Sequence, residues 1–167
     1  MSESVVEEYG ARERGFTIVR TFTAPPAEVF AAWTDPEKLG WFFNPEVPIE
    51  KDVEVDLRVD GVWRLKMWVD EDNQYFTGGL YREIVPPERL VFRWGAVDGW
   101  PEIDPHNPDD GPLVTLTFTP SGAGTVMTFD LDLPEHLDEE KVREWFATGM
   151  QQGWSQTLDR LAPDGAR

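Results

Sequence analysis

A carboxylate and a phenol two positions apart are the best candidates for acid–base chemistry. Glu83 and Tyr81 belong to a predicted strand over residues 75–85. If both side chains face an apolar interior, desolvation raises the pKa of the carboxyl group, which can then act as a general acid or base. The simpler interpretation, which we favour, is that Glu83 faces water or pairs with Arg82 or Arg93.

The inward face of this strand is left open by the sequence. Gly78 and Gly79 indicate a bulge or bend that resets the alternation of side chains. After them, the inward residues are either Leu80, Arg82 and Ile84 or Tyr81, Glu83 and Val85.

The sequence around His106 contains side chains that could bind a divalent cation. Besides the histidine itself, these are the carboxylates of Asp98, Asp104, Asp109 and Asp110. Their spacing matches no metal motif, so a solvated acidic loop without a metal is expected. His136 also lies in a predicted loop, which leaves a Ser-His-Asp arrangement without support. The chain has no cysteine, and therefore no disulfide, thiolate nucleophile or Cys-based zinc site. We expect no cofactor.

A set of apolar residues and glycines can form the wall of a binding cavity. It consists of Trp41, Phe43, Trp63, Leu65, Met67, Trp94, Phe118, Phe129, Phe146, Gly149, Met150, Gly153 and Trp154. For any single residue of this set, a position in the core is the simpler interpretation, which we favour. Taken together, the Met and Trp content and the two glycines favour an adaptable apolar cavity, with Trp41 and Phe43 near its entrance.

One long amphipathic helix is predicted from Asp138 to Ala162, because apolar residues recur along it with a period near 3.6. Asp138 is its expected N-cap, and Pro163 follows its end. Gly149 and Gly153 on its apolar face each cost about 1 kcal/mol of helix stability against Ala. We therefore expect either a strand backbone or a ligand to approach the helix there.

Seven strands are predicted from alternating apolar residues and turn signals. They cover residues 16–22, 53–59, 63–69, 75–85, 90–94, 114–119 and 127–133, with two short helices after the first strand. This order predicts an α+β fold in which an antiparallel sheet curls around the C-terminal helix. Residues 1–14 are charged and aperiodic and are predicted to be a disordered tail before a single domain over residues 15–163.

The 167 residues include 15 Lys and Arg against 32 Asp and Glu, for a formal net charge of −17. Such a charge repels phosphate groups, so neither nucleic-acid binding nor membrane insertion is expected. The acidic N-terminal segment has no signal-peptide pattern, and we expect a cytoplasmic location. The oligomeric state is left open.

Several segments resemble a known family. They are residues 23–37 (TAPPAEVFAAWTDPE), the aromatic-Asn-Pro sequence at 43–45, residues 81–94 (YREIVPPERLVFRW), and Gly153-Trp154 followed by residues 158–161 (LDRL). These look like the START-like (SRPBCC, helix-grip) superfamily and, within it, the AHSA-type family of homologues of the heat-shock-protein-ninety ATPase activator. The resemblance spans residues 16–162. It implies a helix-grip fold with a cavity between sheet and helix, which the superfamily uses for lipids, sterols, polyketides and plant hormones.

The loop over residues 96–111 is longer and more acidic than the hairpin of relatives, and it alters the expected cavity mouth. Our leading hypothesis is a binding protein for a small hydrophobic, lipid- or polyketide-like molecule. The alternatives are a co-chaperone-like module that activates a chaperone ATPase, and a cyclase- or hydrolase-type enzyme using Glu83 and Tyr81.

Overall fold

A computed structural model describes residues 7–12, 14–43, 52–68, 70–104 and 106–161. Two predictions concern residues outside these ranges: the disorder of residues 1–6 and the end of the domain at residue 163.

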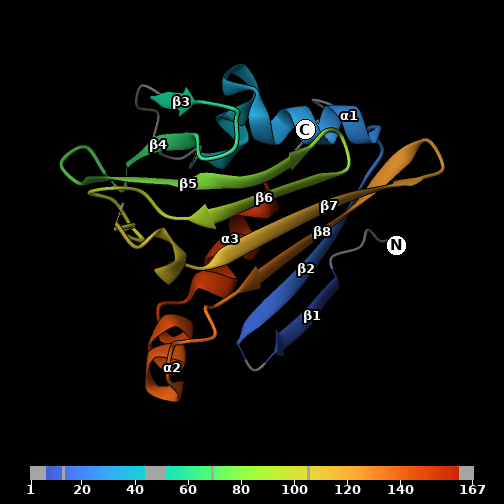
Figure 1. Cartoon of the computed structure of the whole chain (residues 1–167). Coiled ribbons are helices and arrows are strands. Elements are labelled where there is room, and N and C mark those ends of the chain that lie inside the picture. Colours follow the sequence, from blue (N-terminus) through green and yellow to red (C-terminus); the bar gives the residue numbers. More distant parts are fainter. Residues whose placement is uncertain (1–6, 13, 44–51, 69, 105, 162–167) are drawn as a thin grey trace.

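The body of the molecule is one antiparallel sheet of eight strands (Figure 1). In chain order these are β1 (Glu7–Arg12), β2 (Gly15–Phe22), β3 (Val53–Val55), β4 (Val62–Trp68), β5 (Gln74–Val85), β6 (Arg89–Trp94), β7 (Leu113–Ser121) and β8 (Gly124–Asp132). Across the sheet their order is β1-β2-β8-β7-β6-β5-β4-β3. Strands β2 to β8 correspond to the seven predicted ones, although β3 ends at Val55 and the prediction of a strand up to residue 59 is wrong. The predicted α+β, helix-grip architecture is confirmed.

Strand β1 corrects the prediction of a disordered tail over residues 1–14. It pairs with β2 through Glu7 opposite Val19 and Ala11 opposite Phe16, so the domain begins before residue 15. An edge strand of this kind is held by main-chain hydrogen bonds along one side only. Its sequence, EEYGAR, has no apolar alternation, so the pattern used to find the other strands did not reveal it.

Two short helices follow β2, as predicted. They are α1 (Pro26–Thr34) and the 3-10 helix η1 (Pro36–Phe42). Asp35 begins the second, since its carboxylate accepts a hydrogen bond from the Glu37 amide at 2.9 Å. Phe30 of α1 packs edge-on against Phe118 of β7, which holds the pair of helices at one end of the sheet.

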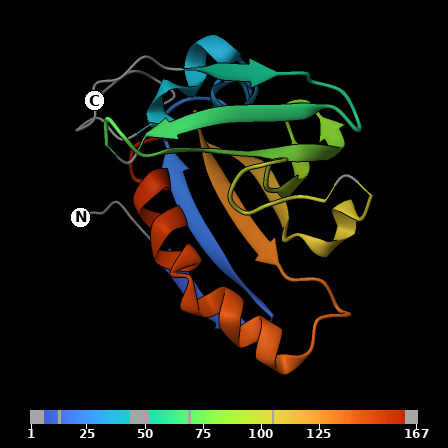
Figure 2. The same ribbon diagram turned by 90° about the vertical axis from the view of Figure 1, so that its left-hand side faces the viewer.

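The C-terminal helix is broken, and this corrects the prediction of one helix from Asp138 to Ala162. Helix α2 (Glu139–Ala147) and helix α3 (Met150–Leu158) are separated at Gly149, whose φ of 79° lies in the left-handed region. The predicted cap is confirmed, because the Asp138 carboxylate accepts a hydrogen bond from the Lys141 amide at 2.8 Å. Figure 2 shows the two helices running across the inner face of the curved sheet.

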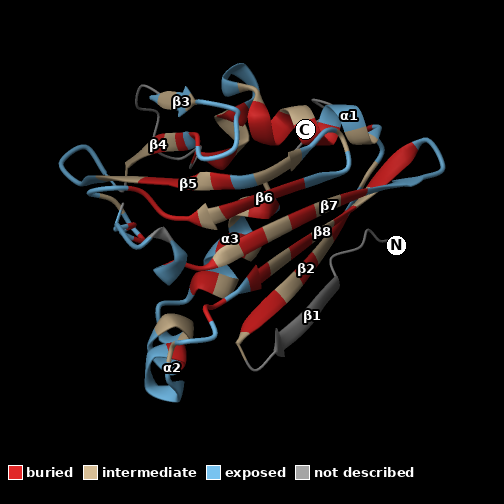
Figure 3. Ribbon diagram, viewed as in Figure 1, coloured by how far each residue is buried: buried red, intermediate tan, exposed pale blue. Residues whose placement is uncertain are grey.

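Helix α3 is packed against the sheet, whereas α2 is largely exposed (Figure 3). The Trp154 indole lies 4.7 Å from the Phe129 ring and 6.4 Å from the Trp33 ring, between centroids. The buried Arg20 of β2 also binds the C-terminal helix through polar contacts. Its guanidinium donates to the Asp159 carboxylate at 3.1 Å and to the Ser155 hydroxyl at 3.0 Å. These contacts fix α3, and with it the residues that it presents to the interior.

Within the part of the chain that the structure describes, no helix is both long enough and apolar enough to cross a membrane.

Candidate functional site

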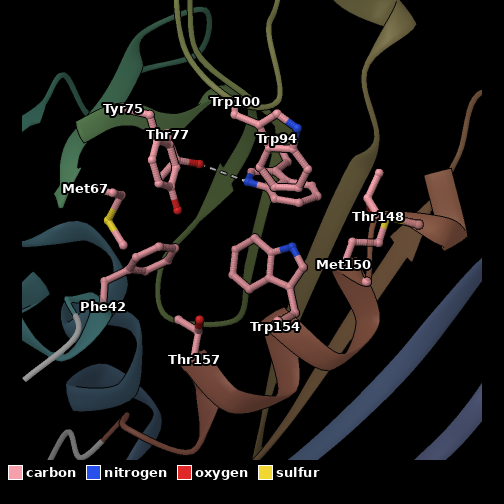
Figure 4. Close-up of a pocket in the computed structure, with 12 residues that line it drawn as sticks. Phe42, Met67, Tyr75, Thr77, Trp94, Trp100, Thr148, Met150, Trp154 and Thr157 are labelled. Carbon is pink, nitrogen blue, oxygen red and sulfur yellow. Dashed lines mark hydrogen bonds between the residues drawn. The ribbon is translucent and has the colours of Figure 1, made fainter. Parts of the chain in front are cut away.

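A pocket of about 210 Å³ lies between α3 and the strands β4, β5 and β6 (Figure 4). Its wall is mostly aromatic and sulfur-containing side chains, with threonines and glycines between them. The lining residues are Phe42, Met67, Tyr75, Thr77, Trp94, Trp100, Thr148, Gly149, Met150, Gly153, Trp154 and Thr157. One wall is therefore sheet and the other is helix, as the predicted fold requires.

Regular geometry brings most of these side chains together. On α3, Met150, Gly153, Trp154 and Thr157 recur at helical spacing and share one face. On the sheet, alternation along β5 turns Tyr75 and Thr77 to the same side, next to Met67 of β4 and Trp94 of β6.

Four residues outside the strands and α3 complete the wall: Thr148 and Gly149 at the junction of the two C-terminal helices, Phe42 and Trp100. Phe42 comes from the end of η1, and its ring meets that of Trp154 edge-on at 5.6 Å. Trp100 comes from the long loop after β6 and packs edge-on against Trp94 at 5.2 Å. Because the Trp100 side chain is 42% exposed, it forms part of the rim.

Hydrogen bonds engage some of the polar groups in the wall and leave others free. The Trp94 indole N–H donates to the Thr77 hydroxyl at 3.1 Å, and the Thr148 hydroxyl donates to the Trp145 carbonyl at 2.6 Å. By contrast, no bond joins the hydroxyl groups of Tyr75 or Thr157 to any residue in the described ranges. These two hydroxyl groups are therefore available to a ligand, and the buried indole N–H of Trp154 also has no partner among the described residues.

None of the twelve residues that line the pocket carries a charge. Arg160 exerts its positive charge on Tyr75, and its guanidinium donates to the carbonyl oxygens of Trp41 at 3.2 Å and Phe42 at 2.8 Å. Burial raises the pKa of the Tyr75 hydroxyl, and the positive charge of Arg160 opposes that rise. Tyr75 is thus a neutral hydrogen-bond donor and acceptor at physiological pH.

The two helix glycines stand beside open space. A methyl group placed on either Gly149 or Gly153 would meet no atom within 4 Å. The expected close approach of a strand backbone is therefore wrong, while the alternative of space for a ligand remains. Gly149 has a second reason to be glycine, because its left-handed backbone strains any larger residue.

The structure brings together six of the thirteen residues predicted for the binding site. These are Met67, Trp94, Gly149, Met150, Gly153 and Trp154. Four others, Trp63, Leu65, Phe118 and Phe129, are buried in the core, outside the pocket wall. In the alternating pattern a core position and a pocket position look alike, since both face inward.

The remaining three predicted residues also lie outside the pocket. Phe43 is buried in the core, and Trp41 packs on Trp33 while its indole N–H donates to the Ala32 carbonyl at 2.9 Å. Phe146 lines a separate hollow, together with glutamines of α3. Phe42, which lies between Trp41 and Phe43 in the chain, is the residue of this segment that lines the pocket.

Six lining residues were missed from the sequence: Phe42, Tyr75, Thr77, Trp100, Thr148 and Thr157. Tyr75 and Thr157 carried a usable signal, because each continues the inward face of its strand or helix. Trp100 carried none, since it lies in an irregular loop.

Glu83 and Tyr81 do not form an acid–base pair. A bulge between them in β5 turns the two side chains to different surroundings. Tyr81 is fully buried, its hydroxyl has no hydrogen-bond partner, and burial raises its pKa, whereas Glu83 is half-exposed and bonds Arg89 at 3.0 Å. Neither of the two proposed registers describes the whole strand, because the bulge lies beyond Tyr81 and not at Gly78-Gly79.

The acidic loop is held by its own hydrogen bonds. The Asp104 carboxylate accepts from the His106 amide at 2.9 Å, and this bond contributes most to lowering the pKa of Asp104. His136 reaches Asp110 at 2.8 Å. Over the described ranges, no group of three or more His, Cys, Asp or Glu residues is arranged to hold a metal ion.

Solved structures with the same fold come from several bacteria. Protein Ms6760 from Mycobacterium smegmatis is 21% identical, with a TM-score of 0.70 over 94% of this chain and 93% of its own. A protein from Arthrobacter aurescens is 22% identical, with a TM-score of 0.73 over 93% of this chain and 88% of its own. DynU16, a putative protein in the dynemicin biosynthetic locus, is 22% identical, with a TM-score of 0.59 over 87% of this chain and 45% of its own. At these identities the likeness shows the fold alone.

A comparison with curated proteins gave no significant match. A family model does match, over residues 23–163, and its description is Activator of Hsp90 ATPase homolog 1-like protein. This range contains every residue that lines the pocket, and it begins at the Thr23 motif from which the resemblance was inferred. The chain belongs to the Activator of Hsp90 ATPase homolog 1-like family.

Proposed function

We propose that the protein binds a small, mostly apolar molecule in the pocket between the sheet and α3. The observation that supports this most directly is the pocket wall itself, which is aromatic and sulfur-rich and contains no charged side chain. Ligand sites of proteins are typically concave and apolar, with a few polar groups that orient the ligand. The Tyr75 and Thr157 hydroxyl groups provide such polar groups here.

Gly153 supports the same proposal from the side of the helix. It lies inside α3, where glycine costs about 1 kcal/mol against alanine, and the space beside it is open. Because Gly153 is exposed and also lines the pocket, this open space lies at the pocket mouth, where the lack of a side chain leaves room for a ligand to enter. DynU16 places one protein of this fold in a biosynthetic locus, which is compatible with a small-molecule ligand.

The proposed function is binding without catalytic turnover of the ligand. The pair first considered for catalysis is divided by the β5 bulge, and Glu83 is half-exposed on a salt bridge with Arg89. The proposed function therefore includes no acid–base chemistry by Glu83 and Tyr81.

The experiment is a thermal-shift screen of the purified protein against lipids, sterols and aromatic compounds. A ligand at 100 times its Kd adds about 2.7 kcal/mol, which raises Tm by about 5–10 °C for a chain of this length. Gly153→Phe should abolish the shift because its ring fills the pocket mouth, while the matched control Gly153→Ala should retain it. A shift that survives Gly153→Phe would place binding elsewhere, and a panel without any hit would refute the proposal.

A second candidate is an interaction with a chaperone of the Hsp90 class, which the family match favours. An apolar hollow of about 150 Å³ on the sheet includes Val62 and Val97, both more than two-fifths exposed, and offers a place for a partner. The test is the chaperone's ATPase rate with added protein. Val97→Glu should remove any stimulation, and Val85→Glu, at an exposed valine outside the hollow, should not. No stimulation by the unaltered protein would exclude this candidate.

A further inference from the structure

We infer that the ligand is an uncharged, planar aromatic compound of one or two rings that carries an oxygen atom against the Tyr75 and Thr157 hydroxyl groups. This inference rests on the proposed binding function and specifies its ligand. Size, wall geometry, charge and free hydrogen-bonding groups each support it separately.

The size of the pocket limits the ligand. Its volume of about 210 Å³ exceeds the roughly 150 Å³ of a cavity that accepts benzene. It is below the roughly 300 Å³ at which sites for drug-sized ligands begin. A compound of one or two rings fits between these limits, whereas a sterol or a complete lipid does not.

The geometry of the wall suits a flat ring. The Phe42 and Trp154 rings meet at 88°, and the Trp94 and Trp100 rings meet at 87°. Each pair is in direct edge-to-face contact, so its two rings turn differently oriented surfaces to the pocket that they both line. Aromatic rings prefer offset-stacked and edge-to-face contacts, which such a wall can offer to a flat ligand. Met67 and Met150 add polarizable sulfur atoms, which also favour aromatic neighbours.

Charge excludes ionised ligands. No lining residue is charged, so a buried ion would lose its hydration without a counter-charge in the wall. Arg160 does not line the pocket, and its guanidinium already donates hydrogen bonds to the Trp41 and Phe42 carbonyl groups. Its positive potential at Tyr75 still favours the partial negative charge of a neutral oxygen at that end of the pocket.

Tyr75 and Thr157 supply the polar contact. In Figure 4 the Tyr75 hydroxyl, from the sheet, and the Thr157 side chain, from the helix, both point into the space beside Phe42 and Trp154. The other hydroxyl groups of the wall, on Thr77 and Thr148, already have partners. A ligand oxygen in this space would complete the hydrogen bonding of the two free groups, which an all-carbon ligand would leave unmet.

The test compares naphthalene, 2-naphthol and the cation 2-naphthylmethylammonium by NMR titration of the purified protein. We expect 2-naphthol to bind about 3- to 10-fold more tightly than naphthalene, the range of one net hydrogen bond, and the cation to bind more weakly than either. Tyr75→Phe should bring 2-naphthol within about twofold of naphthalene. The matched control is Tyr81→Phe, which removes a buried hydroxyl outside the pocket and should leave both affinities unchanged.

Three results would overturn the inference. The first is equal affinity for naphthalene and 2-naphthol in the unaltered protein, and the second is an equal loss for both in Tyr75→Phe. The third is binding of sterols or lipids, blocked by Gly153→Phe, without binding of the naphthalene compounds. This last result refutes the small aromatic ligand while leaving the proposed binding function intact.

Discussion

Two glycines four residues apart should respond in opposite ways to the same added methyl group. Gly149 and Gly153 both face open space, so neither substitution by alanine creates a clash. Their backbones differ, because Gly149 has a φ of 79° and Gly153 lies within α3. The sign of the change in stability therefore depends on backbone conformation alone.

The magnitudes follow from that difference. Gly153→Ala should raise the free energy of unfolding by about 1 kcal/mol, the difference in helix propensity. At Gly149, the left-handed conformation destabilises the folded alanine variant by about 1–2 kcal/mol. Alanine also lowers the conformational entropy of the unfolded chain, which offsets part of this loss, so the free energy of unfolding should fall by about 1 kcal/mol. The variants should differ by about 2 kcal/mol, or about 4–8 °C in Tm for a chain of this size.

Urea unfolding followed by circular dichroism measures both values, with the unaltered protein as reference. A gain of stability in both variants would refute the reasoning, since it would mean that Gly149 is free to adopt a helical backbone and that α2 and α3 can join. Loss of stability in Gly153→Ala alone would show that the space beside α3 is smaller than the structure has it.

Three further predictions concern single side chains. Trp154→Ala should cost about 3–5 kcal/mol in urea unfolding, because it removes the indole at the centre of the ring contacts; a loss below about 1 kcal/mol would contradict its central place. Glu83→Gln should change stability by less than about 1 kcal/mol and leave ligand binding unaltered, since its bond to Arg89 is a surface ion pair; any loss of binding would reopen a role for this carboxylate. Burial raises the pKa of Tyr81, so the folded state keeps this proton while the unfolded chain loses it above about pH 10, and stability falls as pH rises through that region. Tyr81→Phe should flatten this alkaline fall, which unfolding curves from pH 8 to pH 11 would measure, and an unchanged slope would exclude Tyr81 as its source.

Local patterns predicted most of the fold. Alternation located β2 and β4 to β8, and the cap at Asp138 was recognised because capping depends on neighbours in the chain. The features that were missed depend on contacts across the molecule or on backbone angles. Strand β1 exists through pairing with β2, and the helix break at Gly149 needs a positive φ that the residue type permits but does not require.

The site was only partly predictable for a related reason. Periodicity identifies which residues face inward, and Met150 and Trp154 were found in this way. It does not separate a filled interior from a hollow one, so Phe129 and Trp94 looked equivalent although only Trp94 lines the pocket. Trp100 reaches the rim through the fold of a long loop, which no local pattern encodes.

The Trp154 indole has a consequence for how relatives can diverge. One side of it packs on Phe129 in the core, and another side forms the pocket wall, so a change there alters stability and ligand preference together. Residues of the rim, such as Trp100 and Thr148, are not part of the core, so changes there should affect stability less than changes at Trp154. Natural variation in ligand preference should therefore accumulate at the rim, while the inner wall changes slowly across the family.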